Sequence, residues 1–210
     1  MKKLKKGILI VFEGIDGGGK TTQAKMLIER LCKKGYDAVY FREPSGSRWG
    51  MEIRKKAAYK DSISPEGELD LFLKDRRENV EKNLKPALKE NKIVILDRYY
   101  FSTIAYQGAK GISQQRIRKM NEEFTVLPDL VIILDIGPSQ GLGRIGGREK
   151  KDLLFEREDY LLKVREIFNS FREDNIVHIK ADMPLNKIAD EIEQVTLDYL
   201  IKQKTTPDPS

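Results

Sequence analysis

The sequence predicts an α/β fold in which helices cover both faces of a parallel β-sheet. Five short apolar runs rich in Ile and Val alternate with amphipathic stretches of helical spacing. The apolar runs are nearly continuous, which is typical of strands buried on both faces. Strands that alternate with helices favour a parallel sheet, and such sheets bind ligands at the carboxyl ends of their strands.

Each expected element has its own local signals. The strands are predicted at residues 7–14, 37–43, 92–98, 129–136 and 175–181. The helices are predicted at residues 21–35, 64–91, 155–174 and 184–203. Gly35 is a natural C-cap for the first helix. Ser64 suits the N-cap of the second helix, and Pro65 suits its first helical position.

One segment interrupts this alternation. Residues 141–152 are rich in glycine, basic and poor in apolar side chains, so they form either a solvated loop or a mobile basic lid. We expect a single domain over residues 1–204, followed by a disordered tail at 205–210.

The amino-acid composition indicates what kind of ligand the protein binds and in which compartment it works. The chain has 39 Lys and Arg against 33 Asp and Glu, a formal charge of +6, which suits an anionic ligand but also arises from solvated helix faces. Cys32 is the only cysteine, so no disulfide forms within the chain. The first apolar run is too short for a secretory signal, and no stretch approaches a membrane span. A cytoplasmic protein without a membrane partner is therefore expected.

Residues 14–21 fit the phosphate-loop pattern G-x-x-x-x-G-K-[ST], following an apolar strand and opening an amphipathic helix. Glycines let backbone N–H groups converge on phosphate oxygens, and the helix N-terminus adds positive potential. Lys20 would reach the outer phosphates of ATP, and the Thr21 hydroxyl would bind Mg²⁺. The predicted ATP-binding residues are Gly14, Ile15, Asp16, Gly17, Gly18, Gly19, Lys20, Thr21 and Thr22.

An Asp-Arg pair ends another predicted strand. Asp97 would hold Mg²⁺ or one of its waters, although an aspartate there could also be a simple helix cap. Arg98 could bind a transferring phosphoryl group. Phosphoryl transfer requires mainly positioning and charge neutralisation from the protein.

Several motifs in one order resemble the thymidylate kinase family: FEGIDGGGKTTQ, REP at 42–44, DRYYFSTIAYQG and LPDLVIILDI. The resemblance extends from about residue 8 to residue 172. It implies a P-loop NTPase-like three-layer fold of the nucleoside monophosphate kinase type, with a five-stranded parallel sheet and a short lid. It also implies a homodimer that transfers the γ-phosphate of ATP to dTMP, in dTTP biosynthesis.

The resemblance assigns an acceptor site as well. Phe72 would stack on the base and Arg76 would bind its edge, and their i and i+4 positions share a helix face. From the sequence alone, a core position suits Phe72 better. Tyr106 would pack under the deoxyribose. The other acceptor residues are expected to be Asp16, Glu43, Pro44, Arg54, Arg98, Ser102, Thr103 and Gln107.

The resemblance also suggests the source of the catalytic charges. No basic residue precedes Lys20 in the loop, so Arg144 and Arg148 of the lid would join Lys20 and Arg98 in catalysis. Asp16 would accept a hydrogen bond from the 3′-hydroxyl of the acceptor, unless it is only a turn residue.

Alternatives remain at this stage. The bulky SGSRWG segment (45–50) and the charged Lys74 and Asp75 lie near the acceptor side, which leaves another deoxynucleoside monophosphate open as substrate. A nucleotide-dependent switch or a nucleic-acid-binding ATPase could use the same loop. The chain has neither an N-K-x-D element nor a recognisable nucleic-acid module, so no nucleic-acid partner is expected.

Overall fold

Five parallel strands form one sheet in the computed structural model, which describes residues 2, 4–57, 63–145 and 151–205, with only the backbone at 151–156, 204 and 205. The strand order is β2-β3-β1-β4-β5. The strands are β1 (Ile8–Glu13), β2 (Ala38–Arg42), β3 (Ile93–Asp97), β4 (Leu130–Asp135) and β5 (Ile176–Lys180). The predicted parallel α/β sheet and its five strands are confirmed.

The register brings several strand ends to one edge of the sheet. Phe12 of β1 and Arg42 of β2 are both aligned with Asp97 of β3. On its other side, β1 pairs with β4, so the strand order reverses at β1. Ligands bind such sheets at this kind of reversal, beyond the carboxyl ends of the strands. The phosphate loop leaves β1 at this point.

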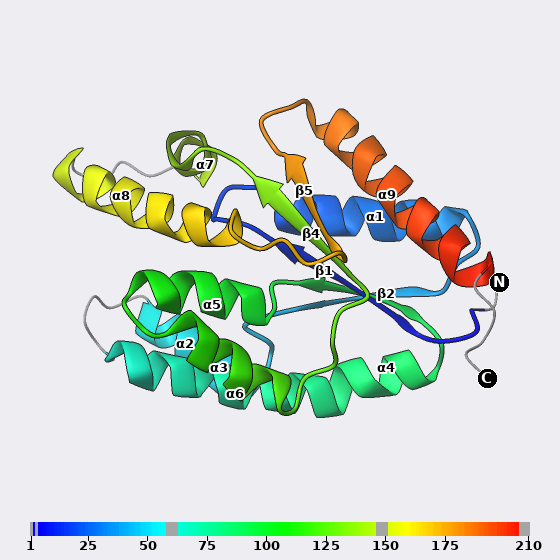
Figure 1. Cartoon of the computed structure of the whole chain (residues 1–210), viewed down its shortest axis with the longest axis horizontal. Coiled ribbons are helices and arrows are strands. Elements are labelled where there is room, and N and C mark those ends of the chain that lie inside the picture. The colour runs from blue at the N-terminus through cyan, green and yellow to red at the C-terminus, as the bar shows by residue number, and fades with distance from the viewer. Residues whose placement is uncertain (1, 3, 58–62, 146–150, 206–210) are drawn as a thin grey trace.

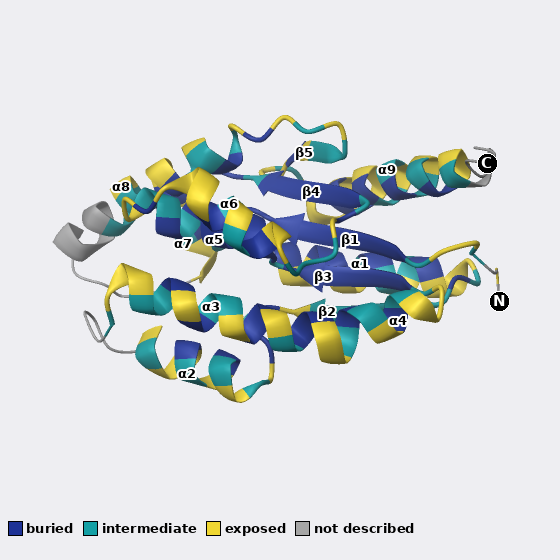
Figure 2. Ribbon diagram, turned by 60° about the horizontal axis from the view of Figure 1, so that its bottom comes forward, coloured by how far each residue is buried: buried dark blue, intermediate teal, exposed yellow. Residues whose placement is uncertain are grey.

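Helices cover both faces of the sheet. They are α1 (Lys20–Lys33), α2 (Arg48–Ala57), α3 (Pro65–Asn79), the π-helical turn η1 (Val80–Leu84), α4 (Lys85–Lys89), α5 (Tyr100–Ala109), α6 (Gln114–Glu122), α7 (Pro138–Ile145), α8 (Lys151–Phe168) and α9 (Leu185–Thr205). Helices α1 and α9 pack together on one side of the sheet, and α3 to α6 lie on the other (Figure 1). Figure 2 shows the central strands fully buried between these layers.

The caps predicted for two helices are present. Gly35, just after α1, has a φ of 84°, the left-handed conformation that ends many helices. The Ser64 hydroxyl accepts a hydrogen bond from the Gly67 N–H at 3.2 Å, at the start of α3. Local sequence therefore sets the end of α1 and the start of α3.

The helix predicted over residues 64–91 is divided into α3, η1 and α4. Pro86 explains the interruption, because it lacks an N–H and its ring clashes with the carbonyl group four residues earlier. A π-helical turn before it absorbs the mismatch. The helix predicted over 155–174 spans 151–168 instead.

Four helices, α2, α5, α6 and α7, were not predicted from the periodicity. Helix α7 extends into the segment predicted as a loop or lid at 141–152, and α8 begins at Lys151. Residues 146–150 lie outside the described residues. Helix α9 continues to Thr205, one residue into the predicted tail, and 206–210 also lie outside the described residues.

Within the part of the chain that the structure describes, no helix is both long enough and apolar enough to cross a lipid bilayer.

Candidate active site

The phosphate loop is a strand–loop–helix junction, as predicted. Gly14 has a φ of 128°, and a Cβ there would lie 2.4 Å from the Leu134 carbonyl oxygen. Gly17 has a φ of 80°, and its Cβ would lie 2.1 Å from the Gly141 carbonyl oxygen. Backbone from β4 and α7 therefore approaches the loop too closely for any side chain at these positions.

Lys20 lies inside this loop with 6% of its surface exposed. Its Nζ donates to the carbonyl oxygens of Gly14 at 3.0 Å and Ile15 at 2.8 Å. Burial and then the charge of Arg98 lower the pKa of Lys20 to about 7, although Asp16 and Asp97 oppose the shift. The Lys20 amine thus lies at the centre of the loop, beside a cavity of about 240 Å³ that Asp97 and Arg98 also line.

The two residues predicted to bind metal are in direct contact. The Thr21 Oγ1 donates to Asp97 Oδ2 at 2.5 Å, and the Tyr40 hydroxyl donates to the same oxygen at 3.0 Å. Oxygen donors suit Mg²⁺, which is usually held by one or two protein groups together with phosphates and water. Among the described residues no group of three or more His, Cys, Asp or Glu side chains could hold a metal ion.

Arg98 follows β3 in a left-handed conformation with a φ of 70°. Its Nη2 forms an ion pair with Asp16 Oδ1, and its Nη1 donates to the Ser102 hydroxyl at 3.0 Å. The guanidinium also lies 5.2 Å from the centre of the Tyr106 ring. A non-glycine residue in this region of backbone space costs about 1–3 kcal/mol and is common at functional sites.

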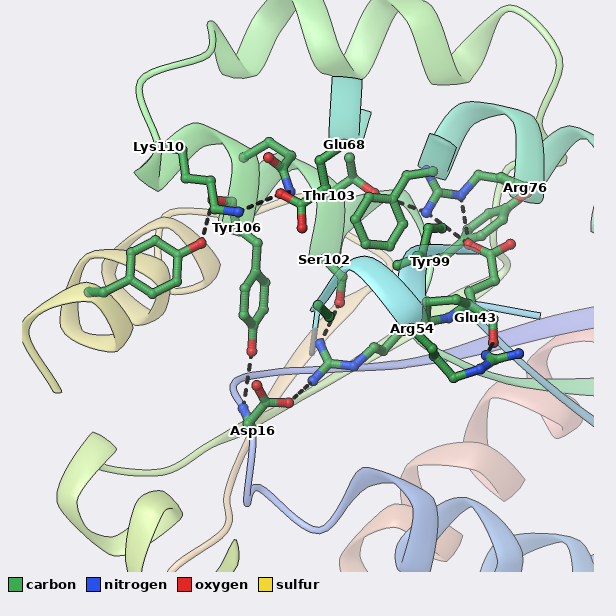
Figure 3. Close-up of a pocket in the computed structure, with 17 residues that line it drawn as sticks. Asp16, Glu43, Arg54, Glu68, Arg76, Tyr99, Ser102, Thr103, Tyr106 and Lys110 are labelled. Atoms are coloured by element: carbon green, nitrogen blue, oxygen red, sulfur yellow. Dashed lines mark hydrogen bonds and ion pairs between the residues drawn. The ribbon is translucent and has the colours of Figure 1, made fainter. Parts of the chain in front are cut away.

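A second cavity, of about 310 Å³, lies between α3, α5 and the segment after β2 (Figure 3). It contains every residue predicted for the acceptor site. The lining residues are Asp16, Glu43, Pro44, Ile53, Arg54, Ala57, Glu68, Phe72, Arg76, Arg98, Tyr99, Ser102, Thr103, Tyr106, Gln107, Lys110 and Tyr160. Asp16, Glu43 and Arg98 line both this acceptor cavity and the phosphate-loop cavity, so the two cavities meet there.

Arg76 has more partners than the sequence indicated. It is 1% exposed, and its Nε donates to Glu43 Oε2 at 2.8 Å. Its Nη1 and Nη2 donate to Asn121 Oδ1 at 2.5 Å and Thr103 Oγ1 at 3.0 Å. Burial raises the pKa of Glu43 even though Arg76 opposes the shift. Arg76 is therefore part of a buried polar cluster as well as of the cavity wall.

Tyr106 connects the phosphate loop to the acceptor cavity. Its hydroxyl oxygen accepts a hydrogen bond from the Asp16 N–H at 3.1 Å. Its carbonyl oxygen accepts one from the Tyr160 hydroxyl of α8 at 2.8 Å. Figure 3 shows the ring standing between these two contacts, so it forms a fixed wall of the cavity.

The sequence reasoning missed several residues of this cavity. Glu68 accepts hydrogen bonds from Gln107 at 3.0 Å and from Lys110 (Figure 3). Glu68 lies four residues before Phe72 on α3, so the helical spacing could have indicated it. Tyr160 carries no such local signal, because α8 is brought to the cavity only by the tertiary fold.

Arg144, the first of the two predicted lid arginines, lines neither the acceptor cavity nor the phosphate-loop cavity that holds Lys20. Arg144 Nη2 donates to the Ala181 carbonyl oxygen at 2.9 Å, and its Nη1 lies 3.5 Å from the Gly17 carbonyl oxygen. It lines a third cavity, of about 480 Å³, together with Thr22, Met183 and Ile188. Arg148 lies outside the described residues.

Two adjoining cavities that share two carboxylates and an arginine allow a P-loop enzyme to bring two phosphorylated ligands together. This is the arrangement of a nucleoside monophosphate kinase, and the chain is a phosphotransferase of that class. It belongs to the thymidylate kinase family, whose sequence model matches residues 12–192.

Individual relatives agree over nearly their full lengths. The chain is 42% identical to a probable thymidylate kinase of Archaeoglobus fulgidus, over 95% of this chain and all of the relative. It is 45% identical to a thymidylate kinase of Akkermansia muciniphila, over 88% and 89% of the two chains. The crystal structure of thymidylate kinase from Ehrlichia chaffeensis superposes with a TM-score of 0.73 at 31% identity, covering 90% of this chain and 98% of that one.

Proposed function

We propose that the protein transfers the γ-phosphate of ATP to dTMP, giving ADP and dTDP. The observation that carries the proposal is the meeting of the phosphate-loop cavity and the acceptor cavity at Asp16 and Arg98. The relatives from A. fulgidus and A. muciniphila, which carry the name thymidylate kinase, support the choice of dTMP as acceptor.

The phosphate loop binds the triphosphate of ATP in this proposal. Its backbone N–H groups and the N-terminus of α1 face the phosphates, and Lys20 turns from the loop carbonyls to the outer phosphates. Thr21 and Asp97 hold Mg²⁺, directly or through water. When bound, Mg²⁺ neutralises charge on the β- and γ-phosphates.

The acceptor cavity binds dTMP. Phe72 stacks on the base, Arg76 hydrogen-bonds its edge, and Tyr106 packs under the deoxyribose. Ser102, Thr103 and Gln107 complete the base pocket. The base and sugar are thus held on the α3 and α5 side, so the acceptor phosphate is directed toward the phosphate loop.

Asp16 and Arg98 act at the junction of the two ligands. Asp16 accepts a hydrogen bond from the 3′-hydroxyl of dTMP, and Arg98 binds the donor and acceptor phosphates together. Glu43, Pro44 and Arg54 shape the segment near the acceptor phosphate, where Arg54 donates to the Pro44 carbonyl oxygen at 2.8 Å. Arg144 and Arg148 neutralise charge that develops on the transferring phosphoryl group.

The assembly and the compartment complete the proposal. We infer a cytoplasmic homodimer from the family resemblance and from the single cysteine. Sedimentation equilibrium tests the assembly, and a mass of one chain at micromolar concentration would contradict it.

A coupled assay of ADP release with dTMP, dCMP, dGMP and dAMP tests the reaction. We expect turnover with dTMP to exceed that with each other acceptor. Strong turnover of dCMP or dGMP without turnover of dTMP would replace dTMP with another deoxynucleoside monophosphate.

A further inference from the structure

Glu13, the last residue of β1, is completely buried. No role was predicted for it from the sequence. Its Oε1 accepts hydrogen bonds from the backbone N–H groups of Tyr99 at 2.8 Å and Ser102 at 3.2 Å. Its Oε2 accepts one from the Ser102 hydroxyl at 2.5 Å. The side chain of the N-cap residue Tyr99 does not cap helix α5. Instead Glu13 of β1 accepts from the Tyr99 N–H, and it shares the Ser102 N–H with the Tyr99 carbonyl oxygen, which lies 3.1 Å from that nitrogen.

Capping a helix with a buried carboxylate costs free energy, because the charge must be removed from water. Burial raises the pKa of Glu13 to about 7, although Ser102, Arg98 and the Tyr99 N–H oppose the shift. A serine at the N-cap itself would accept a hydrogen bond from the Ser102 N–H without burying a charge. A further function at this position would account for the buried carboxylate.

The Ser102 hydroxyl connects Glu13 to the site. Ser102 has one hydroxyl hydrogen, which it donates to Glu13 Oε2. Above about pH 7 the carboxylate of Glu13 is ionised and can only accept hydrogen bonds. The Oγ lone pairs therefore face Arg98, whose Nη1 donates to them at 3.0 Å. The other end of the guanidinium pairs with Asp16. Ser102 and Asp16 thus hold Arg98 from two sides. Glu13 determines which way the Ser102 hydroxyl hydrogen points.

We propose that Glu13 is a positioning residue for Arg98, acting through the polarity of the Ser102 hydroxyl. The inference rests on the proposed function, in which Arg98 binds the phosphates of both nucleotides. Because Glu13 lies behind Ser102 and does not line the acceptor cavity, it acts without contact with substrate.

Glu13→Gln is the sharpest test, because it nearly preserves shape and can reverse the polarity. The glutamine carbonyl can still accept from the two backbone N–H groups, while its NH₂ group donates to Ser102. The hydroxyl hydrogen of Ser102 then points toward the guanidinium of Arg98, and the two donor groups repel each other. At pH 8, where Glu13 of the wild type is ionised, we expect kcat for dTMP to fall about 100-fold, the scale of a 1 Å misplacement, with KM for ATP within about twofold of wild type.

A double-mutant cycle separates positioning from general damage. In a Ser102→Ala background no hydroxyl remains to be reversed, so adding Glu13→Gln should lower kcat by less than about twofold. Asp129→Asn is the control, since that carboxylate accepts hydrogen bonds from Leu9 and Tyr199 away from the site. It should lower the melting temperature while leaving kcat near the wild-type value.

The outcomes are distinguishable. If wild type does not phosphorylate dTMP, the proposed function fails. If wild type is active but Glu13→Gln stays within twofold of it, or the effects of the two substitutions multiply, the role of Glu13 is overturned. If Glu13→Gln does not fold, Glu13→Asp replaces it. Its retained carboxylate should keep kcat within about tenfold of wild type, and a loss as large as that of Arg98→Ala would overturn the inference.

Discussion

The carboxylate of Asp16 forms an ion pair with the guanidinium of Arg98, which ties the phosphate loop to the residue that follows β3. Burial would by itself raise the pKa of Asp16, but Arg98 and Lys20 outweigh it and hold the pKa below its ordinary value. Asp16 is therefore ionised near neutral pH and is an acceptor. The proposed contact with the second substrate would account for this negative charge inside a phosphate loop.

Asp16→Asn should impair the use of dTMP far more than the binding of ATP. The substitution keeps the shape of the side chain and removes its charge, so it weakens a charge-assisted hydrogen bond to the 3′-hydroxyl. We expect kcat/KM for dTMP to fall about 10- to 100-fold. Steady-state kinetics with varied dTMP and direct titration with an ATP analogue measure the two sides. Equal losses on both sides would make Asp16 a turn residue.

Arg76 should be important for folding as well as for binding, because it is the buried partner of Glu43. Removing one member of a buried ion pair leaves an uncompensated charge, so Arg76→Ala should lower the free energy of unfolding by about 3–5 kcal/mol. Urea denaturation at pH 7 measures the loss. Arg116→Ala is the matched control, since Arg116 and Glu66 form an exposed pair, and it should change stability by less than about 1 kcal/mol. Similar losses for both would contradict the role of burial.

The stability difference between Glu13→Gln and the wild type should depend on pH. The pKa of Glu13 rises from 4.5 to about 7 on folding, so ionisation disfavours the folded state. This penalty is absent below pH 4.5, grows as pH rises, and is complete above about pH 7. Glu13→Gln removes the titration. Its free energy of unfolding, relative to wild type, should therefore improve by up to about 3 kcal/mol between pH 4.5 and pH 8. A difference that does not change with pH would contradict the burial of an ionisable carboxyl group.

The sequence was sufficient for the centre of the sheet because β1, β3 and β4 are buried on both faces. Runs such as Ile8–Phe12 and Ile93–Leu96 have no polar alternation, and this pattern is distinctive. Helix α5 was missed for a related reason. Tyr100, Phe101, Ile104 and Ala105 are all buried, so this helix lacks the polar stripe that reveals a surface helix.

Some residues of the candidate site could also be predicted from the sequence, and others could not. The phosphate loop depends on residues close together in sequence, so its spacing alone indicates it. The roles of Glu13 and Tyr160 depend on which elements meet in the fold. In the sequence Glu13 is simply the last residue of a strand. Only the fold brings it to the start of α5, where Tyr99 and Ser102 donate hydrogen bonds to it.

The lid prediction concerns the rate of transfer rather than binding. Arg148→Ala should lower kcat by orders of magnitude, within the 10³–10⁵ range that an arginine of this kind contributes. Nucleotide binding should change little. Arg144→Ala is the companion variant, and because Arg144 lines the cavity beside the phosphate loop, it should also raise KM for ATP. Near-wild-type turnover of Arg148→Ala in a rapid-quench experiment would remove that arginine from the mechanism.

A crystal structure of the protein with dTMP and a non-hydrolysable ATP analogue tests the central claim most directly. The account predicts the thymine base between Phe72 and Arg76, the 3′-hydroxyl within hydrogen-bond distance of Asp16, and Arg98 in contact with both phosphate groups. A thymine base bound outside the cavity between α3 and α5, or a 3′-hydroxyl turned away from Asp16, would contradict it.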